Sequence, residues 1–230
     1  MLKPVLAAGA AAGSYALFPT LLWKAVHRAR RLLAPPRAER TLCLTFDDGP
    51  SAYTPALLDL LRRHQVPAAF FVVADRAAEW PDLIDRMVRE GHTVGCHSAA
   101  HVTPYLLGPA KTRADFDRAL DTMRRLGHPV RYYRPPWGVM SLPNLYELAV
   151  RHLCPVPWDV MAQDWSGIPA AEIVRRLRAR IVPGAVLCLH DGRGTDGAPG
   201  RTIEALSVLL PEWRAQGWRF ARLEEVACHG

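Results

Sequence analysis

The sequence predicts an α/β protein in which a parallel sheet is covered by helices and is preceded by a membrane-anchor helix. Short apolar runs of strand type alternate with helical stretches about seven times after residue 40. Residues 4–23 carry no charge and are long enough to cross the roughly 30 Å hydrocarbon layer as a helix. Half of the 230 residues are hydrophobic, so a sizeable core can be buried.

The N-terminal apolar segment has three interpretations. An uncleaved membrane anchor is favoured, because Lys3 alone makes a weak n-region for a cleaved signal peptide and the apolar stretch continues beyond the small residues. The cleaved signal peptide stays an alternative. A second alternative is an Ala-rich soluble helix packed on the domain, although Gly9, Gly13 and Pro19 weaken a helix in water.

A basic cluster at residues 24–31 follows the expected anchor and outweighs Lys3 before it. By the positive-inside rule, the C-terminal domain would face the cytoplasm, with the extracytoplasmic face as the alternative. The cluster would also bind anionic lipid headgroups. We therefore expect two regions: 1–40, a membrane-anchor helix with a basic juxtamembrane linker, and 41–230, a catalytic domain.

Charge and cysteine usage narrow the classes of partner. Residues 41–230 carry 22 basic and 21 acidic side chains, because 7 of the 29 basic and 1 of the 22 acidic residues precede them. This near-neutral body does not support a nucleic-acid partner, and the oligomeric state is not defined by the sequence. Five cysteines without a C-x-x-C pair argue against a disulfide framework and favour a reducing compartment.

The body divides into alternating elements. The expected strands are 41–46, 68–73, 93–96, 131–133, 157–160, 185–189 and 218–221, and the expected helices are 55–61, 81–90, 112–126, 142–151, 170–181 and 202–216. In a barrel built from such units, chemistry collects at the C-terminal ends of the strands. Polar side chains do follow these strands: Asp47, Asp48, His97, Arg134, Asp164 and His190.

Two of these groups have the spacing of a metal site. Asp47 and Asp48 can serve one site only if the backbone breaks after the strand, which the following Gly-Pro pair permits. His97 and His101 are four residues apart, the spacing that places two imidazoles on one face of a helical turn. Two histidines and one carboxylate leave coordination positions open, as in catalytic metal sites, and the second aspartate can act as a base.

These residues resemble the polysaccharide deacetylase family, carbohydrate esterase family 4, over residues 41 to about 227. Three motifs carry the resemblance: Thr45 to Pro50, His97 to His101, and Arg134-Pro-Pro-Trp-Gly138. The resemblance implies a distorted (β/α)7-type barrel and metal-dependent removal of acetyl groups from sugars. It also implies one divalent ion, zinc in the first place, with cobalt, nickel or manganese as alternatives.

The resemblance further implies a role for each site residue. Asp48, His97 and His101 would be the metal ligands. Asp47 would be the general base, oriented by Arg134, and His190 the general acid. The backbone N–H of Trp137 would help to hold the oxyanion, while Pro136 and Leu189 would line the substrate site.

Two positions depart from the family pattern. Met161 stands where a first aspartate is expected, and Cys188 stands where a leucine is expected two residues before His190. We expect Asp164 to pair with Arg134 in a supporting role, and we expect Cys188 to alter acyl-group preference.

The sequence therefore predicts a membrane-anchored hydrolase of carbon–nitrogen bonds. It would remove N-acetyl groups, or O-acetyl or formyl groups, from an amino sugar in a polysaccharide, oligosaccharide or lipid-linked glycan. The alternative is a catalytically silent member that binds glycan or acts as a scaffold at the membrane.

Overall fold

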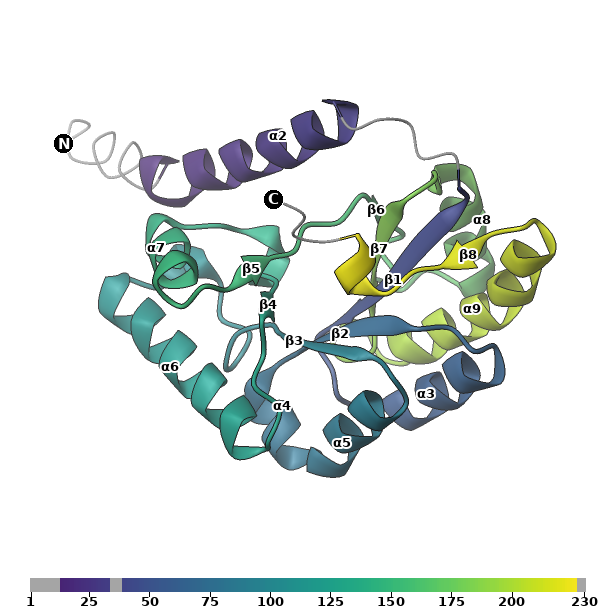
Figure 1. Cartoon of the computed structure of the whole chain (residues 1–230), viewed down its shortest axis with the longest axis horizontal. Coiled ribbons are helices and arrows are strands. Elements are labelled where there is room, and N and C mark those ends of the chain that lie inside the picture. The colour runs from purple at the N-terminus through teal and green to yellow at the C-terminus, as the bar shows by residue number, and fades with distance from the viewer. Residues whose placement is uncertain (1–12, 34–38, 227–230) are drawn as a thin grey trace.

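The computed structural model describes residues 13–33 and 39–226. One π-helical turn, η1 (Gly13–Leu17), leads into an N-terminal helix, and the other helices alternate with strands (Figure 1). The strands are β1 (Thr41–Asp47), β2 (Ala68–Val72), β3 (Thr93–Cys96), β4 (Tyr132–Tyr133), β5 (Cys154–Pro155), β6 (Val160–Met161), β7 (Ala185–His190) and β8 (Arg219–Phe220). The α-helices are α2 (Phe18–Leu33), α3 (Thr54–Arg63), α4 (Ala74–Glu79), α5 (Pro81–Arg89), α6 (Pro109–Arg125), α7 (Leu142–Val150), α8 (Ala170–Arg180) and α9 (Ala198–Ala215). Short 3₁₀ turns, η2 (Pro104–Leu106), η3 (Pro136–Gly138) and η4 (Leu223–Glu225), complete the described chain.

All strand pairs are parallel, as the alternation of strands and helices predicts. The order across the sheet is β5-β4-β3-β2-β1-β7-β6, and β8 pairs with the beginning of β1. This arrangement is consistent with a distorted (β/α)7 barrel. Among the described residues no strand pairing joins β5 to β6, so the barrel has an open side there.

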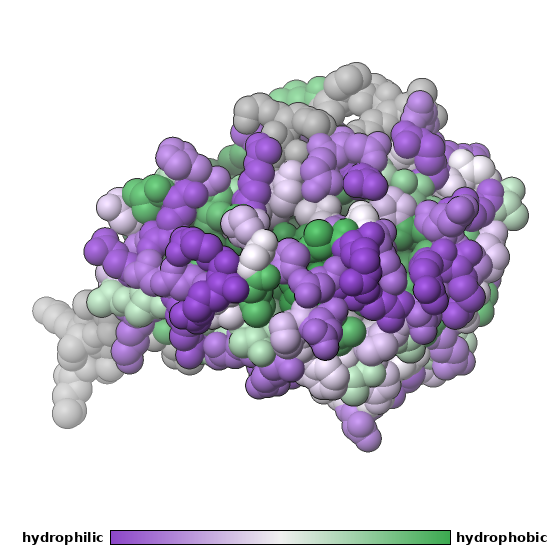
Figure 2. All heavy atoms as spheres, turned by 60° about the horizontal axis from the view of Figure 1, so that its bottom comes forward, coloured by the Kyte–Doolittle hydropathy of each residue, from purple (hydrophilic) through white to green (hydrophobic). Residues whose placement is uncertain are grey.

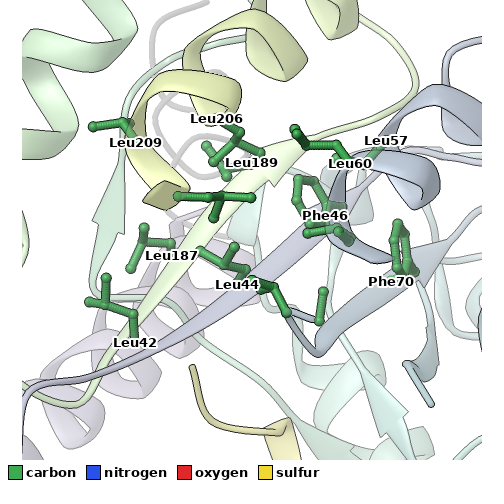
Figure 3. Close-up of a cluster of buried hydrophobic side chains, with 14 of the residues drawn as sticks. Leu42, Leu44, Phe46, Leu57, Leu60, Phe70, Leu187, Leu189, Leu206 and Leu209 are labelled. Atoms are coloured by element: carbon green, nitrogen blue, oxygen red, sulfur yellow. The ribbon is translucent and has the colours of Figure 1, made fainter. Parts of the chain in front are cut away.

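Side chains along β1 and β7 point alternately to the hydrophobic core under the helices and to the interior of the barrel. Leu42, Leu44 and Phe46 on β1 pack with Leu187 and Leu189 on β7. Helices α3 and α9 cover this layer with leucines such as those labelled in Figure 3. Because successive side chains of a strand point to opposite faces, the residues between them face the inside of the barrel, and these include Thr45 and Asp47.

The expected transmembrane helix is not supported. Within the described residues no helix is both long and apolar enough to cross a bilayer, and residues 4–12 of the expected span lie outside the described chain. The remainder of that span packs on the domain: Ala16, Pro19 and Thr20 are buried. The structure thus resembles the alternative of a helix packed on the body more than an anchor separated from it.

Helix α2 covers the open side of the barrel. In Figure 1 it runs above α7 and β5 and ends near β6. A cavity of about 360 Å³ between α2 and the β5–β6 connection is lined by Trp23 and His27 on one side and Trp158 and Asp159 on the other. The described part of the basic cluster, residues 24–31, is therefore helical and packs on the body.

Two local expectations also change. Helix α4, between β2 and β3, was not expected, because its six residues (Ala74–Glu79) are too short to show helical periodicity. The sequence argued against a disulfide framework, but Cys154 is disulfide-bonded. Cys43, Cys96 and Cys188 are free and buried.

Candidate active site

The predicted site residues come together at the C-terminal ends of the central strands. Asp47 is the last residue of β1 and lies opposite His190, the last residue of β7, in the parallel ladder. His97 directly follows β3, and Arg134 follows β4. The parallel sheet thus gathers, at one end of the barrel, groups that are as far apart in the sequence as Asp47 and His190.

The chain turns sharply after β1, and this turn brings two adjacent carboxylates into one site. Asp48 has a left-handed φ of 74°, which breaks the alternation of the strand. A neighbouring loop approaches closely, because a Cβ on Gly192 would lie 2.0 Å from the carbonyl oxygen of Asp48. Only glycine at position 192 permits this contact, which supports the conformation of the turn.

The two histidines reach the site through a loop after β3, not through a regular helix. Ser98 and His101 have positive φ angles of 71° and 55°. His97 Nδ1 lies 2.6 Å from the carbonyl oxygen of Arg134. Since a carbonyl oxygen only accepts, Nδ1 carries the proton, and Nε2 is left with its lone pair directed at Asp48.

Asp48, His97 and His101 converge as a set of ligands. Asp48 Oδ1 lies 2.9 Å from His101 Nε2 and 3.4 Å from His97 Nε2, and all three side chains are buried. Two ligands that are each about 2.1 Å from a tetrahedral zinc ion stand about 3.4 Å apart. The three atoms therefore have the spacing of a metal site with positions left open.

The electrostatics of Asp48 agree with this interpretation. Its Oδ1 is buried, and among the described residues it lacks a partner with hydrogen-bond geometry. Burial opposes ionisation, but the contacts with His101 and His97 outweigh it and hold the pKa of Asp48 well below its usual range. An ionised carboxylate with an unsatisfied oxygen beside two imidazoles fits a divalent cation.

Asp47 lies next to these ligands and is held by Arg134. Arg134 Nη1 donates to Asp47 Oδ1 over 2.7 Å and to Thr45 Oγ1 over 2.6 Å. The guanidinium is fully buried and stacks 4.1 Å from the ring centroid of Phe71. Its Nε also donates to the carbonyl oxygen of Val156, so the cation is fixed from several sides and in turn fixes the position of the Asp47 carboxylate.

Asp164 pairs with His190, and the expected pairing with Arg134 is wrong. Asp164 Oδ1 lies 2.9 Å from His190 Nδ1, and Asp164 Oδ2 accepts from the His190 backbone N–H over 2.8 Å. Burial would lower the pKa of His190, but the charge and hydrogen bond of Asp164 outweigh it and raise this pKa to about 9. His190 is therefore protonated near neutral pH.

The predicted substrate-binding residues separate into two groups. Trp137, in η3 after β4, lies beside the ligands with its ring centroid 4.2 Å from that of His101. It is 55% exposed, while the preceding Pro136 is buried. Leu189 does not reach the site, because it points to the helix-facing side of β7 and lies in the hydrophobic core (Figure 3).

The two departures from the family pattern leave the charged pairs intact. Met161 and Cys188 are register partners on β6 and β7. Arg134 has Asp47 as its ionic partner, so Met161 does not leave it without one. Cys188 points into the site and donates its thiol to Asp47 Oδ2 over 3.4 Å.

The sequence did not single out one buried carboxyl group, that of Asp191. Its Oδ2 accepts from Thr54 Oγ1 over 2.6 Å, and a Cβ on Gly49 would lie 2.2 Å from this carboxyl group. Burial raises the pKa of Asp191 to about 7. The Asp-Gly pair at 191–192 has the composition of an ordinary surface turn, so only its position after a buried strand could have marked it.

Comparison with known proteins defines the family. The profile described as polysaccharide deacetylase matches residues 34–149. A chitooligosaccharide deacetylase of Bradyrhizobium sp. is 36% identical over 199 residues, which are 81% of this chain and 90% of that protein. A peptidoglycan-N-acetylglucosamine deacetylase of Bacillus cereus is 30% identical over 190 residues, which are 82% of this chain and 68% of that protein.

Solved structures agree with this result. The Bc1960 peptidoglycan N-acetylglucosamine deacetylase superposes with a TM-score of 0.77 at 29% identity, over 83% of this chain and 89% of that chain. The family 4 carbohydrate esterase from Streptomyces lividans, in complex with acetate, gives a TM-score of 0.73 at 28% identity, over 81% and 95%. The fold and site thus define a hydrolase of carbon–nitrogen bonds in N-acetylated sugars. The chain belongs to the polysaccharide deacetylase family.

Proposed function

We propose that this chain removes the N-acetyl group from N-acetylglucosamine units of a glycan, of the chitooligosaccharide or peptidoglycan type. One observation carries the proposal: three convergent ligand atoms lie directly beside two buried charged pairs, Asp47–Arg134 and Asp164–His190. The relatives named as deacetylases of such glycans support it. O-acetyl and formyl groups are further candidate substrates.

Asp48, His97 and His101 would hold one divalent metal ion. Zinc suits this set of one carboxylate and two imidazoles, and cobalt, nickel and manganese are the alternatives. When bound, the ion supplies Lewis-acid polarisation of the acetamido carbonyl and lowers the pKa of water. His97 is already oriented for this role by its hydrogen bond to the carbonyl oxygen of Arg134.

Asp47 would act as the general base. Its Oδ2 lies 4.0 Å from His97 Nε2, so it borders the ligand cluster without being needed as a ligand. Arg134 fixes the carboxylate through a hydrogen bond to Oδ1. The remaining oxygen can accept the proton of the attacking water.

His190 would act as the general acid. Asp164 binds its Nδ1, so Nε2 is the nitrogen that can donate toward the site. With a pKa of about 9, the imidazolium is present at neutral pH and can protonate the departing amine. Asp164 is a positioning residue that acts through His190, and Thr202 Oγ1 holds its second oxygen over 2.9 Å.

Trp137 would contribute to the oxyanion site. Its φ of 55° turns the backbone of η3 beside His101, which supports a role of its N–H in holding the developing oxyanion next to the ligand cluster. Pro136 would stiffen this turn below the substrate. Cys188, in contact with Asp47, would influence which acyl group is accepted.

The catalytically silent alternative is less well supported. It depended on the replacements at positions 161 and 188 damaging the site. Arg134 and Asp47 remain bonded, and Asp164 is engaged with His190 instead. A family member of similar fold, a CE4 family pseudoenzyme from Bacillus anthracis at 22% identity with a TM-score of 0.73, shows that the fold alone does not establish activity.

Acetate release from N-acetylglucosamine oligomers tests the proposal. We expect turnover that a chelator abolishes and that added zinc, cobalt, nickel or manganese restores. His101→Ala should lose both bound metal and turnover, while Asp82→Asn, at an exposed position of helix α5, should keep both. Stoichiometric metal binding without release of acetate or formate from any acylated sugar would instead establish the silent alternative.

We also propose that the chain works at a membrane, on its extracytoplasmic face. The positive-inside argument required a spanning helix, which the described residues do not contain. The disulfide at Cys154 supports an oxidising compartment, and peptidoglycan-deacetylating relatives support an envelope substrate. A reporter active only outside the cytoplasm, fused after Gly230, should be active, whereas activity of a cytoplasm-only reporter would reverse the assignment.

A further inference from the structure

The N-terminal helical segment, η1 with α2, has two faces of different chemistry. Its inner face touches the domain at intervals of three or four residues, with Ala16, Pro19 and Thr20 buried and Trp23, His27 and Arg31 half-buried. Its outer face carries the large apolar side chains Leu17, Phe18, Leu21, Leu22, Val26, Leu32 and Leu33. This distribution reverses that of an ordinary surface helix, which turns its apolar face toward the core.

Specific polar contacts hold the inner face in place. Thr20 Oγ1 donates to the carbonyl oxygen of Met140 over 3.1 Å and accepts from the Met140 N–H over 2.9 Å. His27 Nε2 and Arg31 Nε lie 3.0 and 3.2 Å from Asp159 Oδ1. Rolling the helix to bury its apolar face would leave the largely buried Asp159 without these partners, so the apolar face stays outside.

The outer face stands out from the rest of the molecular surface. Seven of the eighteen exposed large hydrophobic side chains of the described residues lie between Leu17 and Leu33, and Phe18 and Leu33 are 62% and 85% exposed. Figure 2, in contrast, shows the face that lies below α2 in Figure 1, and mainly hydrophilic side chains cover it. A contiguous apolar strip of this kind marks an interaction surface.

Basic side chains border the strip. At 100° per residue, Lys24 and Arg28 fall along one edge and Arg30 along the other, and all three are exposed. Lys24 and Arg28 also line the cavity of about 360 Å³ between α2 and residues 157–159. A strip of apolar residues with cations at its edges is the pattern of a helix that lies in a membrane interface.

We propose that the outer face of α2 lies flat in the interface of an anionic lipid bilayer and fixes the orientation of the barrel relative to it. The cations at the edges match anionic phosphate headgroups, and the cavity beside Lys24 and Arg28 has room for one. A second copy of the chain fits less well, because face-to-face packing would bring the cations of both copies together. The twelve residues before Gly13 carry one charge, that of Lys3, so the sequence leading into α2 is compatible with the same interface.

This inference rests on the proposed membrane location and specifies its geometry, so its test reads lipid binding instead of acetate release. The full chain is incubated with vesicles of phosphatidylcholine alone or with added phosphatidylglycerol, and bound protein is measured by co-sedimentation. We expect the wild type to bind anionic vesicles. The double variant Leu21→Glu with Leu22→Glu should bind them at least tenfold more weakly. Val88→Glu with Val208→Glu, which adds the same charge at exposed valines of α5 and α9, should bind like the wild type.

Removal of the basic edge should weaken the preference for anionic lipid. Lys24→Ala with Arg28→Ala is expected to lower binding to anionic vesicles by about tenfold or more, since each cation near such a surface contributes about 1 kcal/mol. All variants should release acetate from a soluble oligosaccharide at the wild-type rate, which shows that they fold. The proposal would be overturned if the glutamate variant bound vesicles as the wild type does. It would also be overturned if light scattering showed that this variant loses self-association and not vesicle binding.

The depth of two spin labels separates a flat helix from a spanning one. Nitroxides attached to Leu21→Cys and Leu32→Cys stand eleven residues apart, or about 16 Å along a helix. The free cysteines Cys43, Cys96 and Cys188 are buried and should not compete for the label. Similar depths of both labels are expected, whereas depths that differ by most of this length would show that α2 is inserted across the bilayer.

Discussion

Two buried pairs of charged side chains flank the ligand cluster, and they differ in one respect. In the first, Asp47 faces Arg134, whose guanidinium is a cation with hydrogen-bond donors and no acceptor. In the second, Asp164 faces His190, whose imidazole can lose its proton. In the proposed mechanism the first pair would stabilise the carboxylate that accepts a proton, and the second would stabilise the imidazolium that donates one. Similar pairing would thus supply opposite functions because the cation differs.

The comparison is tested most severely at Asp47. Asp47→Asn removes the proton acceptor and keeps the shape of the side chain, so turnover should fall by a factor on the order of 10² to 10⁴. The metal content should stay at the wild-type level, because Asp48, His97 and His101 are unchanged. Acetate release and elemental analysis measure the two quantities. Turnover above a tenth of the wild-type rate would remove Asp47 from the role of base.

A smaller effect with a clear signature is expected at Asp164. The proton-donating form of His190 is populated below its pKa of about 9, so activity should fall as the pH rises through this value. Asp164→Asn removes the negative charge, and burial then lowers the pKa of His190, so the alkaline limb should move to lower pH. Near pH 8 turnover should drop by about 10- to 100-fold.

The pH profile of kcat/KM measures this shift. A purely structural role of Asp164 would lower the rate at every pH and leave the limb in place. Such a result would mean that the second pair does not set the protonation of the acid. Thr202→Val removes only the hydrogen bond from Thr202 Oγ1 to Asp164 and keeps the negative charge, so the limb should stay closer to its wild-type position than in Asp164→Asn.

The smallest effect is expected at Cys188. The thiol is a weak donor to Asp47 Oδ2, and Arg134 already holds the other oxygen. Cys188→Ala should therefore change turnover by only several-fold, which corresponds to about 1 kcal/mol for one neutral hydrogen bond. Steady-state assays with N-acetyl and N-formyl substrates measure the rate and the acyl preference together. A loss as large as that of Asp47→Asn would make the thiol a main determinant of the base.

Local pattern predicted the strands and the motifs at their ends, because burial and alternation are recorded in neighbouring residues. Asp47 faces inward for the reason that Leu44 and Phe46 face outward. The same reasoning, applied to β7, excludes Leu189 from the site and admits Cys188.

Pairings across the fold were less accessible from sequence. Asp164 was expected beside Arg134, but the choice between two cations depends on how β6 and β7 are placed, and that is set by tertiary packing. The docking of α2 depends on His27 meeting Asp159, 132 residues away. A basic cluster on an apolar helix gives no local sign of whether it faces lipid, solvent or its own domain.

The helix across the gap between β5 and β6 also bears on where the enzyme can be cut. Trp158 stands between the two regions: its ring lies 5.5 Å from the Arg134 guanidinium on one side, and it lines the cavity beneath α2 on the other. An expression clone that starts where the family match begins, at residue 34, would strip the outer wall from behind the arginine that holds Asp47. We therefore expect a chain that starts at residue 34 to be less stable and less active than one that retains α2.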